Sequence, residues 1–403
     1  MNKSANSLFY ADAQSGALTS VGDFFAMAAS AGHCTPICKP ASTLQAFSCL
    51  VHSMVADVPI TLIDGDLSQS EVSGLIGDNS VPARSPRADF CAAMRAYCDG
   101  DLINFIPRKK WRLRLFTSGT TGRPKSVEHS FETLFGGLRV SPKHAPDVWA
   151  YAFNPTHFAG VCAFAQALFN SNIIVDVFSA EREKIARAFE KFSITHISAT
   201  PTFYRMLCLG KTFTAPTLRS ITSGGETFDE STMNKLSALF PNAKVKNIYA
   251  STECGQALCS GGAVFSIDAA RTRINGGELL LKAGNPPVWV STGDLVEIVG
   301  ENPTRIKFIG RKGKMINVGG YKVNPAEVEE ALRGIEHVLD ARAFPIKNSV
   351  AGNIVGAEVV VDSEMSERQI RAILAQKLQG FKIPRVIKFV DSIQKTRTGK
   401  VKR

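Results

Sequence analysis

Apolar and polar residues alternate along residues 111–116, and this period-two pattern leads directly into a glycine-rich loop. Such alternation predicts a half-buried β-strand. A helical stretch is predicted at residues 181–192. Short apolar runs bounded by polar or glycine residues predict further strands at residues 149–153, 173–177, 194–199, 218–222 and 245–249. Strands that alternate with helices predict an α/β fold in which helices cover both faces of a sheet.

The sequence changes in character after Ile309. Residues 310–314 form a short, charged and glycine-bearing segment, as a hinge or linker would. We therefore place a domain boundary at about residue 310. This division predicts a large N-terminal domain (1–310) with parallel or mixed sheets, and a small α+β C-terminal domain (311–403).

Within the C-terminal domain, Asn324 and Pro325 predict the start of a helix, because asparagine caps helices and proline suits their first turn. Ser366 and Gln369 have the spacing of a capping box, and the helix that they open should end near Gly380. Strands are predicted at residues 338–344, 355–361 and 385–390.

Composition narrows the class of protein. Of the 403 residues, 44% are hydrophobic and 21% are charged, which is ordinary for a soluble globular protein. No apolar run approaches the roughly 20 residues of a membrane span, and no signal peptide is recognisable, so we expect a cytoplasmic protein without a membrane span. The nine cysteines form no C-x-x-C pair, which favours reduced thiols over a zinc site.

Positive charge is concentrated toward the C-terminus. The net charge of the chain is +11, and residues 311–403 hold 18 Lys or Arg against 10 Asp or Glu, a net +8. Phosphorylated small molecules or an acidic partner protein suit such a surface. Nucleic acid is an alternative that rests on charge alone, because no aromatic residues are interleaved for base stacking, and we expect no nucleic-acid partner.

The loop after the first strand, Ser118-Gly-Thr-Thr-Gly-Arg-Pro-Lys-Ser126, is suited to a polyphosphate. Its glycines permit close backbone approach, its hydroxyls are donors and its lysine adds a positive charge. It is nearly a Walker A loop, but Pro124 stands where a backbone N–H would be needed. The residues that we expect to bind the phosphates are Thr117, Ser118, Gly119, Thr120, Thr121, Gly122 and Lys125.

Residues 116–125 closely resemble the phosphate loop of the adenylate-forming superfamily, which includes acyl-CoA synthetases, adenylation domains and beetle luciferases. Further signatures appear in the order of that family, so the resemblance covers the chain from about residue 111 onward. The segment before the loop is shorter than in typical members. The resemblance thus identifies the chain as an N-terminally shortened member.

The resemblance implies a nucleotide site. Tyr249 would lie against adenine, Thr252 would bind a phosphate oxygen, and Glu253 would hold Mg²⁺. Asp294 and Arg311 would bind the ribose hydroxyls. The family lays adenine and the acyl chain along a glycine turn that corresponds here to Gly224, Gly225 and Glu226, and its tyrosine segment corresponds to Asn247, Tyr249, Ala250, Ser251, Thr252 and Glu253. Ala250 replaces the usual glycine.

Two further residues are implied to act on the acid. His157 stands where many family members place a gate beside the substrate carboxylate, although a lone histidine next to Phe158 is also common in a core. Phe158 or Ala159 occupies the position of the aspartate that grips an α-ammonium in amino-acid-activating relatives. This difference favours a plain carboxylate, either aromatic or of medium chain length. Lys400 matches the catalytic lysine, whose charge would stabilise the transition state at the α-phosphate.

The implied reaction consumes ATP·Mg²⁺ and a carboxylic acid, giving an acyl-adenylate and pyrophosphate, after which CoA attacks to form a thioester. The C-terminal domain would rotate about the hinge between these steps, with Gly313 in place of the usual Asp or Lys. One alternative is a stand-alone adenylation enzyme that loads the phosphopantetheine of an acyl carrier protein. Another is a nucleotide-binding pseudoenzyme with little turnover.

Overall fold

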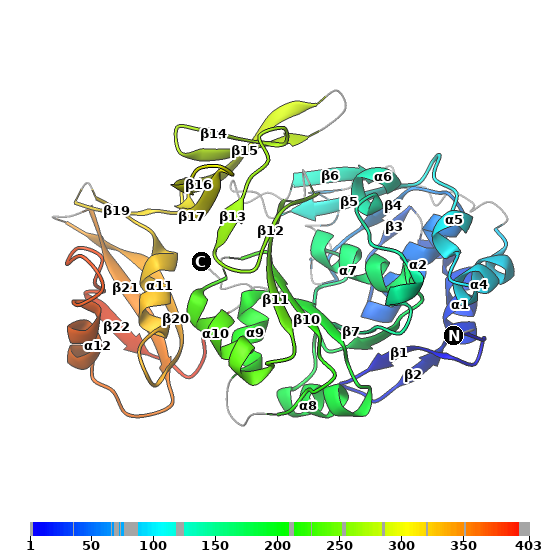
Figure 1. Cartoon of the computed structure of the whole chain (residues 1–403), viewed down its shortest axis with the longest axis horizontal. Coiled ribbons are helices and arrows are strands. Elements are labelled where there is room, and N and C mark those ends of the chain that lie inside the picture. Colours follow the sequence, from blue (N-terminus) through cyan, green and yellow to red (C-terminus); the bar gives the residue numbers. More distant parts are fainter. Residues whose placement is uncertain are drawn as a thin grey trace. The chain divides into compact units, whose positions relative to one another are not determined.

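The computed structural model has the α/β architecture that the sequence predicts, and it describes residues 3–34, 36–65, 67, 72, 74–75, 88–117, 125–208, 213–226, 228–251, 255–283, 287–319, 321–349 and 352–394 (Figure 1). Within these residues, no helix is both long and apolar enough to cross a membrane. The chain divides into two compact units: unit 1 comprises Met1–Ala199 and Phe213–Ile221, and unit 2 comprises Thr200–Thr212 and Thr222–Arg403. The boundary that we placed at residue 310 stays a prediction.

Unit 1 contains most of a largely parallel sheet. Its strand order is β10-β9-β7-β8-β1-β2. β9 pairs in parallel with β7, β7 with β8 and β8 with β1, whereas β2 closes the edge in antiparallel. The strands are β1 (Leu8–Asp12), β2 (Leu18–Ser20), β7 (Val148–Tyr151), β8 (Ile173–Asp176), β9 (His196–Ala199) and the beginning of β10 (Ser220–Gly224).

A second sheet of unit 1 contains the two strands that flank the predicted phosphate loop. β3 (Ile37–Cys38), β4 (Ile60–Leu62) and β5 (Arg112–Thr117) are parallel, and β6 (Lys125–Ser130) runs back antiparallel to β5. The strand that we predicted before the glycine loop is therefore confirmed as β5. Since Thr117 and Lys125 are paired in register, the two strands hold the ends of the loop opposite each other.

Four helices in the described part of unit 1, α1, α2, α4 and α6, begin at side-chain caps that the sequence supplies. Ser20, Ser42, Asp89 and Ser130 each accept a backbone N–H of the first turn, which satisfies an otherwise unpaired donor. The helices are α1 (Val21–Ser30), α2 (Thr43–Val55), α4 (Phe90–Cys98), α5 (Leu102–Phe105), α6 (Phe131–Phe135), α7 (Phe158–Phe169) and α8 (Arg182–Lys191), with short 3₁₀ turns at Ala31–Cys34 and Pro142–His144. α8 matches the predicted helix.

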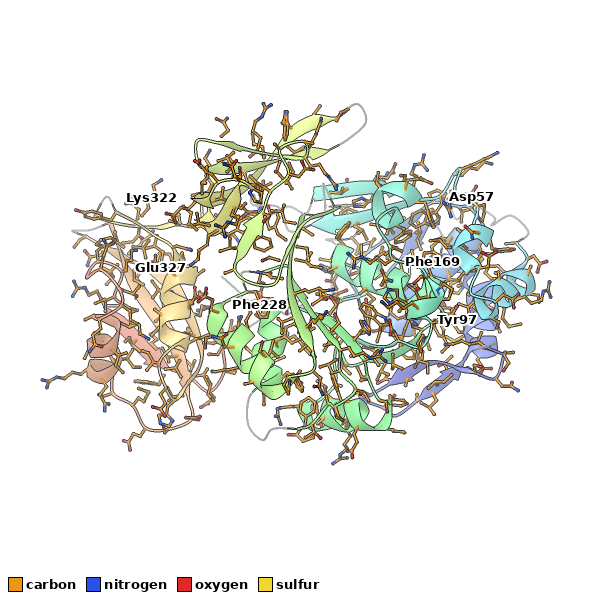
Figure 2. All side chains as sticks on the ribbon, viewed as in Figure 1. Asp57, Tyr97, Phe169, Phe228, Lys322 and Glu327 are labelled. Carbon is orange, nitrogen blue, oxygen red and sulfur yellow. The ribbon has the colours of Figure 1, made fainter. Side chains whose placement is uncertain are left out.

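Aromatic side chains fill the core of unit 1. Phe47 on α2 stacks on Phe164 on α7 with ring centroids 3.9 Å apart. Tyr97 and Phe169 belong to the same core (Figure 2). Offset or edge contacts between rings of this kind add to the free energy gained by burying apolar area. The core thus fixes α2 and α7 against the sheet.

Unit 2 begins with a sheet segment and the helices next to it in the sequence. Strand order there is β12-β11-β10, with β11 (Lys244–Ser251) antiparallel to β12 (Gly255–Ser260). α9 (Pro201–Leu207) and α10 (Glu230–Leu239) belong to this part. An antiparallel sheet follows in the order β13-β17-β16-β15-β14, formed by β13 (Val264–Ser266), β14 (Thr272–Asn275), β15 (Glu278–Ala283), β16 (Val288–Gly300) and β17 (Arg305–Arg311).

The last part of unit 2, which we call the C-terminal lobe, has an apolar core of its own. Its sheet runs β19-β18-β21-β20, and β22 pairs with β21. The elements are β18 (Ile316–Val318), β19 (Tyr321–Val323), α11 (Pro325–Arg333), β20 (Val338–Asn348), β21 (Gly352–Val361), α12 (Glu367–Leu374) and β22 (Val386–Phe389). The predicted helix cap at Asn324 and the capping box at Ser366 are both confirmed.

One helix is shorter than the sequence suggests. We predicted that the helix opened by Ser366 ends near Gly380, but α12 ends at Leu374. Beyond that point the amides of Gln376 and Lys377 bond carbonyls three residues back, at Ile373 and Leu374. These tighter turns interrupt the α-helical pattern, as is common at helix C-termini, although the amide of Leu378 still bonds the carbonyl of Leu374 four residues back.

Candidate functional site

Three side chains that the sequence singled out lie together in unit 2: Tyr249 on β11, Asp294 on β16 and Arg311 on β17. The Tyr249 hydroxyl donates a hydrogen bond to Asp294 Oδ2 over 2.7 Å. Arg311 Nε lies 3.7 Å from the other carboxylate oxygen, Oδ1. Each oxygen of the Asp294 carboxylate therefore faces a different donor, and the carboxylate has a fixed orientation.

The pairing of β16 with β17 brings the carboxylate and the guanidinium together. Asp294 and Arg311 are direct partners in the register of these antiparallel strands. Residues that face each other in this way lie about 5 Å apart, which long side chains span. The Arg311 guanidinium is also held by the carbonyl oxygen of Thr292 at 3.2 Å.

A glycine turn positions Asp294. Gly293 has a φ of +74°, a conformation that residues with a side chain rarely adopt. Its amide donates to Glu278 Oε1 at 2.8 Å, and the amide of Asp294 donates to the hydroxyl of Thr292 at 3.0 Å. The segment Thr292-Gly293-Asp294 (T-G-D) is therefore a turn with hydrogen-bonded amides, and glycine is required at its centre.

The Tyr249 ring is fixed by Phe308. Their ring centroids lie 4.4 Å apart at an interplanar angle of 28°. Burial, reinforced by the negative charge of Asp294, raises the pKa of Tyr249 above its ordinary value. The phenol consequently stays protonated at neutral pH and remains a hydrogen-bond donor to the carboxylate.

The predicted glycine turn follows β10. Gly224 approaches β11 so closely that a Cβ there would lie 3.0 Å from the carbonyl oxygen of Ile248, and Gly225 has a φ of +85°. The carboxylate of Glu226 accepts hydrogen bonds from the amide and the hydroxyl of Thr202, at 3.2 and 2.6 Å. Glu226 therefore anchors the turn to α9.

Two other predicted site residues, Asn247 and Ala250, also lie on β11. Asn247 is buried, and its Nδ2 donates to the carbonyl oxygen of Gly262 at 3.2 Å. Ala250 is half-buried in the same strand, and Ser251 ends it opposite Gly255.

His157 belongs to unit 1, where it is the N-terminal cap residue of α7. Its Nε2 lies 3.3 Å from Oδ2 of Asp64, and the same oxygen accepts a hydrogen bond from Asn154 Nδ2 at 3.3 Å. The imidazole is one-third exposed. The bond to the Asp64 carboxylate, which belongs to a separate segment, fixes the orientation of the His157 ring. Its surroundings therefore differ from those of an ordinary core histidine, which are apolar.

Several predicted residues cannot be placed. Thr117 and Lys125 are described only as strand residues at the ends of the loop. The positions outside the described residues are Ser118, Gly119, Thr120, Thr121, Gly122, Thr252, Glu253 and Lys400. Their predicted roles stay predictions.

Sequence reasoning missed four residues that hold the site. Phe308 lies in an alternating apolar run and could have been expected to face inward, but not to stack on Tyr249. Nothing in the sequence points to Glu278, Thr202 or Asp64, because each binds its partner through folding of distant segments.

Comparison with known proteins decides the family. The family model described as "AMP-binding enzyme" matches residues 109–289, and the one described as "AMP-binding enzyme C-terminal domain" matches residues 327–400. The chain belongs to the adenylate-forming superfamily of AMP-binding enzymes. The family predicted from the sequence motifs is therefore confirmed.

Relatives of this AMP-binding enzyme include the acyl-CoA synthetase ALT10 of Alternaria alternata, which is 26% identical over 369 residues. That match covers 72% of this chain and 63% of ALT10, so the chain spans less than two thirds of the length of that relative. The name of this relative agrees with the predicted enzyme class, an AMP-forming acid–thiol ligase.

Two solved structures share the fold of the AMP-binding enzyme. ATP-bound MatB from Rhodopseudomonas palustris superposes with a TM-score of 0.75 at 20% identity, covering 99% of this chain and 95% of MatB. O-succinylbenzoate coenzyme A synthetase (MenE) from Bacillus subtilis, in complex with ATP and a magnesium ion, gives 0.69 at 17% identity, covering 98% and 95%. The predicted fold class, a large α/β domain followed by a small α+β domain, is confirmed.

Proposed function

We propose that this AMP-binding enzyme activates a carboxylic acid with ATP, releasing pyrophosphate and forming an acyl-adenylate, and then transfers the acyl group to CoA. The observation that carries the proposal is the Tyr249–Asp294–Arg311 cluster. It combines an aromatic ring, an oriented carboxylate and a guanidinium, which are the groups that a nucleoside requires.

The cluster suits the nucleoside part of ATP. A carboxylate accepts hydrogen bonds through both oxygens, so Asp294 can bind a vicinal diol such as the ribose 2′- and 3′-hydroxyls. The guanidinium of Arg311 adds donors for ribose or phosphate oxygens. The ring of Tyr249, which Phe308 holds on one face, supplies an apolar surface for adenine.

The phosphates would be bound by the loop between β5 and β6, through its hydroxyls, its backbone amides and Lys125. Glu253 offers a hard carboxylate oxygen, the donor type that Mg²⁺ prefers, and the metal would neutralise phosphate charge. Lys400 would stabilise the negative charge that develops at the α-phosphate when the carboxylate attacks. Thr252 would bind a phosphate oxygen beside it.

The acid is proposed to lack an α-amino group. In unit 1, α7 starts at Phe158, whose ring centroid lies 5.5 Å from that of His129. No carboxylate that could pair with an ammonium stands at positions 158 and 159. An aromatic or medium-chain acid is therefore the favoured substrate class, with His157 orienting its carboxylate.

CoA is the proposed acceptor, and the family relatives named acyl-CoA and coenzyme A synthetases support it. The excess of Lys and Arg after residue 310 suits the phosphates of CoA, although an acidic carrier protein would also be attracted to it. The C-terminal domain with Lys400 is proposed to rotate between the two half-reactions.

Pyrophosphate-dependent ATP exchange tests the activation step with a panel of aromatic and medium-chain acids. We expect exchange with at least one acid and none without acid. If ATP binds but no acid supports exchange, the enzyme proposal fails in favour of a nucleotide-binding pseudoenzyme. Thioester formation is then compared with free CoA and with phosphopantetheinylated carrier protein. Faster transfer to the carrier protein than to CoA would show that the carrier protein is the acceptor.

A further inference from the structure

Four buried charged side chains form a closed ring in unit 2, in which positive and negative groups alternate. Arg205 Nη1 lies 3.3 Å from Asp229 Oδ2, and the same oxygen lies 3.6 Å from Arg333 Nε. Arg333 Nη1 lies 4.0 Å from Asp340 Oδ1, which in turn lies 3.6 Å from Arg205 Nε. Each of the four side chains is at least nine-tenths buried.

The ring joins two separately packed parts of unit 2. Arg205 lies on α9, and Asp229 caps the N-terminus of α10. Arg333 is the last residue of α11 and Asp340 lies on β20, both in the C-terminal lobe with its own apolar core. Each part thus contributes one arginine and one aspartate, and each pair is neutral by itself.

A buried ion pair adds little net stability, because the cost of removing two charges from water nearly equals their attraction. A buried charge without a partner is far more costly. If the lobe separates from α9 and α10, the cross pairs Arg205–Asp340 and Arg333–Asp229 of the ring break, and the Glu330 carboxylate on α11 also loses its bond to the backbone of Glu230 on α10. Arg205 keeps Asp229 and also Glu226, whose carboxylate lies 3.9 Å away, and Arg333 keeps Asp340, so each arginine retains a carboxylate partner.

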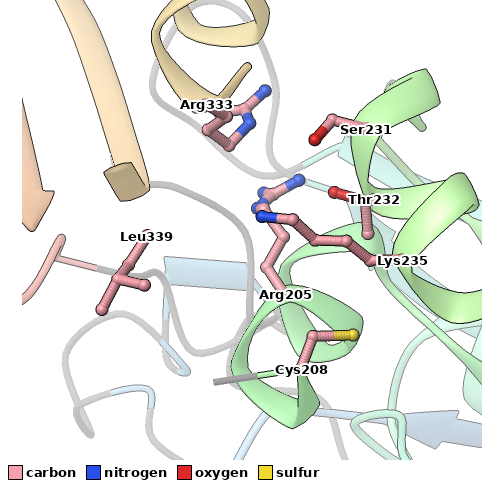
Figure 3. A pocket seen from close by; sticks show the side chains of 7 residues that line it. All are labelled: Arg205, Cys208, Ser231, Thr232, Lys235, Arg333 and Leu339. Carbon is pink, nitrogen blue, oxygen red and sulfur yellow. The ribbon is translucent and has the colours of Figure 1, made fainter. Parts of the chain in front are cut away.

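Polar and apolar side chains both line the space beside the ring. A small pocket of about 80 Å³ is lined by residues from both parts, and Figure 3 shows Arg205 and Arg333 on its opposite sides with Ser231 and Thr232 nearby. Contacts between domains within one chain are typically more polar than a core, which lets the parts move relative to each other.

The pKa shifts of Asp229 and Arg205 reflect their burial and the charges of the other ring members. Burial opposes the charge of Asp229, but Arg333, the Thr232 amide and Arg205 outweigh it, so the pKa of Asp229 lies below its ordinary value. Burial, together with the charge of Arg333, lowers the pKa of Arg205.

We propose that this ring is a reversible latch, which docks the C-terminal lobe on α9 and α10 and releases it without leaving an unpaired charge. The latch goes beyond the proposed catalytic function, because it acts in the protein without ligand. It also lies beside the predicted nucleotide turn: Arg205 Nη2 donates to Thr202 Oγ1 at 2.7 Å, and Thr202 bonds Glu226.

Hydrogen–deuterium exchange of the full chain without substrate tests the latch. Arg205→Gln or Asp340→Asn alone leaves the ring with an excess charge, so we expect exchange to rise about tenfold or more in peptides that cover α9, α11 and β20. The double variant Arg205→Gln/Asp340→Asn keeps the neutral pair Asp229–Arg333. Its exchange in these peptides should fall back below that of either single variant.

Arg342→Gln is the matched control, because it removes a half-buried ion pair with Glu358 at 3.1 Å inside the C-terminal lobe. It should leave the exchange of α9 unchanged. The latch is refuted if the single variants behave like this control, or if the effects simply add in the double variant. It is equally refuted if exchange rises throughout unit 2, since the ring would then only support the fold. Because no substrate is present, a failure here is independent of a failure of ATP exchange.

Discussion

The hydroxyl of Tyr249 donates a hydrogen bond to the carboxylate of Asp294, which lies 45 residues further along the chain. This bond links β11 to β16, and it joins a predicted adenine-binding residue to a predicted ribose-binding residue. The strength of nucleotide binding should therefore depend on the donor as well as on the acceptor.

Tyr249→Phe keeps the ring on Phe308 but removes the donor to Asp294. A hydrogen bond to a charged group is worth about 1.5–3 kcal/mol, so we expect the KM for ATP in the exchange assay to rise about 10-fold or more, with kcat changed less. Tyr97→Phe is the matched control, because it removes a buried hydroxyl that bonds Asn172 in unit 1. An unchanged KM for Tyr249→Phe would contradict a role of this bond in nucleotide binding.

Thr202 is expected to position the glycine turn through Glu226. Thr202→Val preserves the shape of the side chain and the amide bond to Glu226, but it removes the hydroxyl that donates to the half-buried Glu226 carboxylate, so we expect a KM for ATP raised by about 5-fold or more. Thr202→Ser retains the hydroxyl and should restore a value close to wild type. If circular dichroism shows that both variants are folded and their KM values for ATP are the same, the hydroxyl has no positioning role.

His157 is expected to act on the acid rather than on ATP. His157→Ala should raise the KM for the carboxylic acid about tenfold while the KM for ATP stays within about twofold, because its partner Asp64 lies in unit 1. Asp64→Asn should have the same effect to a smaller degree. Equal effects of His157→Ala on both KM values would indicate a general structural role.

Lys400→Ala is expected to abolish adenylation and to leave ATP binding largely intact, because a cation at the α-phosphate matters chiefly in the transition state. We expect a loss of at least about 100-fold in the exchange rate, with the Kd for ATP changed less than about threefold in calorimetry. Lys402→Ala changes a lysine of the same basic segment and should be close to wild type. Similar losses in both variants would point to a nonspecific effect of charge.

Asp176 provides a pH test of stability in unit 1. Its carboxylate accepts the Tyr10 hydroxyl at 2.7 Å, and burial raises the pKa of Asp176 above its ordinary value. In the unfolded chain the group ionises near pH 4, at about 3.9. Between the two pKa values the folded state binds more protons than the unfolded state, so the free energy of unfolding falls as the pH rises through this window.

Asp176→Asn should remove that fall, and the variant should gain stability relative to wild type as the pH is raised above about 4. Urea unfolding at a series of pH values between about 4 and 7 measures the difference. Asp362→Asn, at an exposed site paired with His337, is the control. Parallel pH dependence of Asp176→Asn and wild type would contradict the shifted ionisation.

Much of the secondary structure could be predicted because it depends on local patterns. Period-two alternation before the loop gave β5, and capping chemistry gave the starts of α11 and α12. The end of α12 could not be predicted. A 3₁₀ turn, in which an amide bonds the carbonyl three residues back, differs little in free energy from a further turn of α-helix.

The sequence by itself determined the family and the chemical types of the site residues, since a glycine-rich loop, a tyrosine segment, a T-G-D turn and a C-terminal lysine in fixed order are local motifs. Only the tertiary structure decided which groups hold them: Phe308 behind Tyr249, Thr202 on Glu226, Asp64 on His157, and the ring of Arg205, Asp229, Arg333 and Asp340. The physical reason is that hydrogen bonds and ion pairs act over a few ångströms in space. Partners separated by tens of residues meet only after strands have paired and helices have packed.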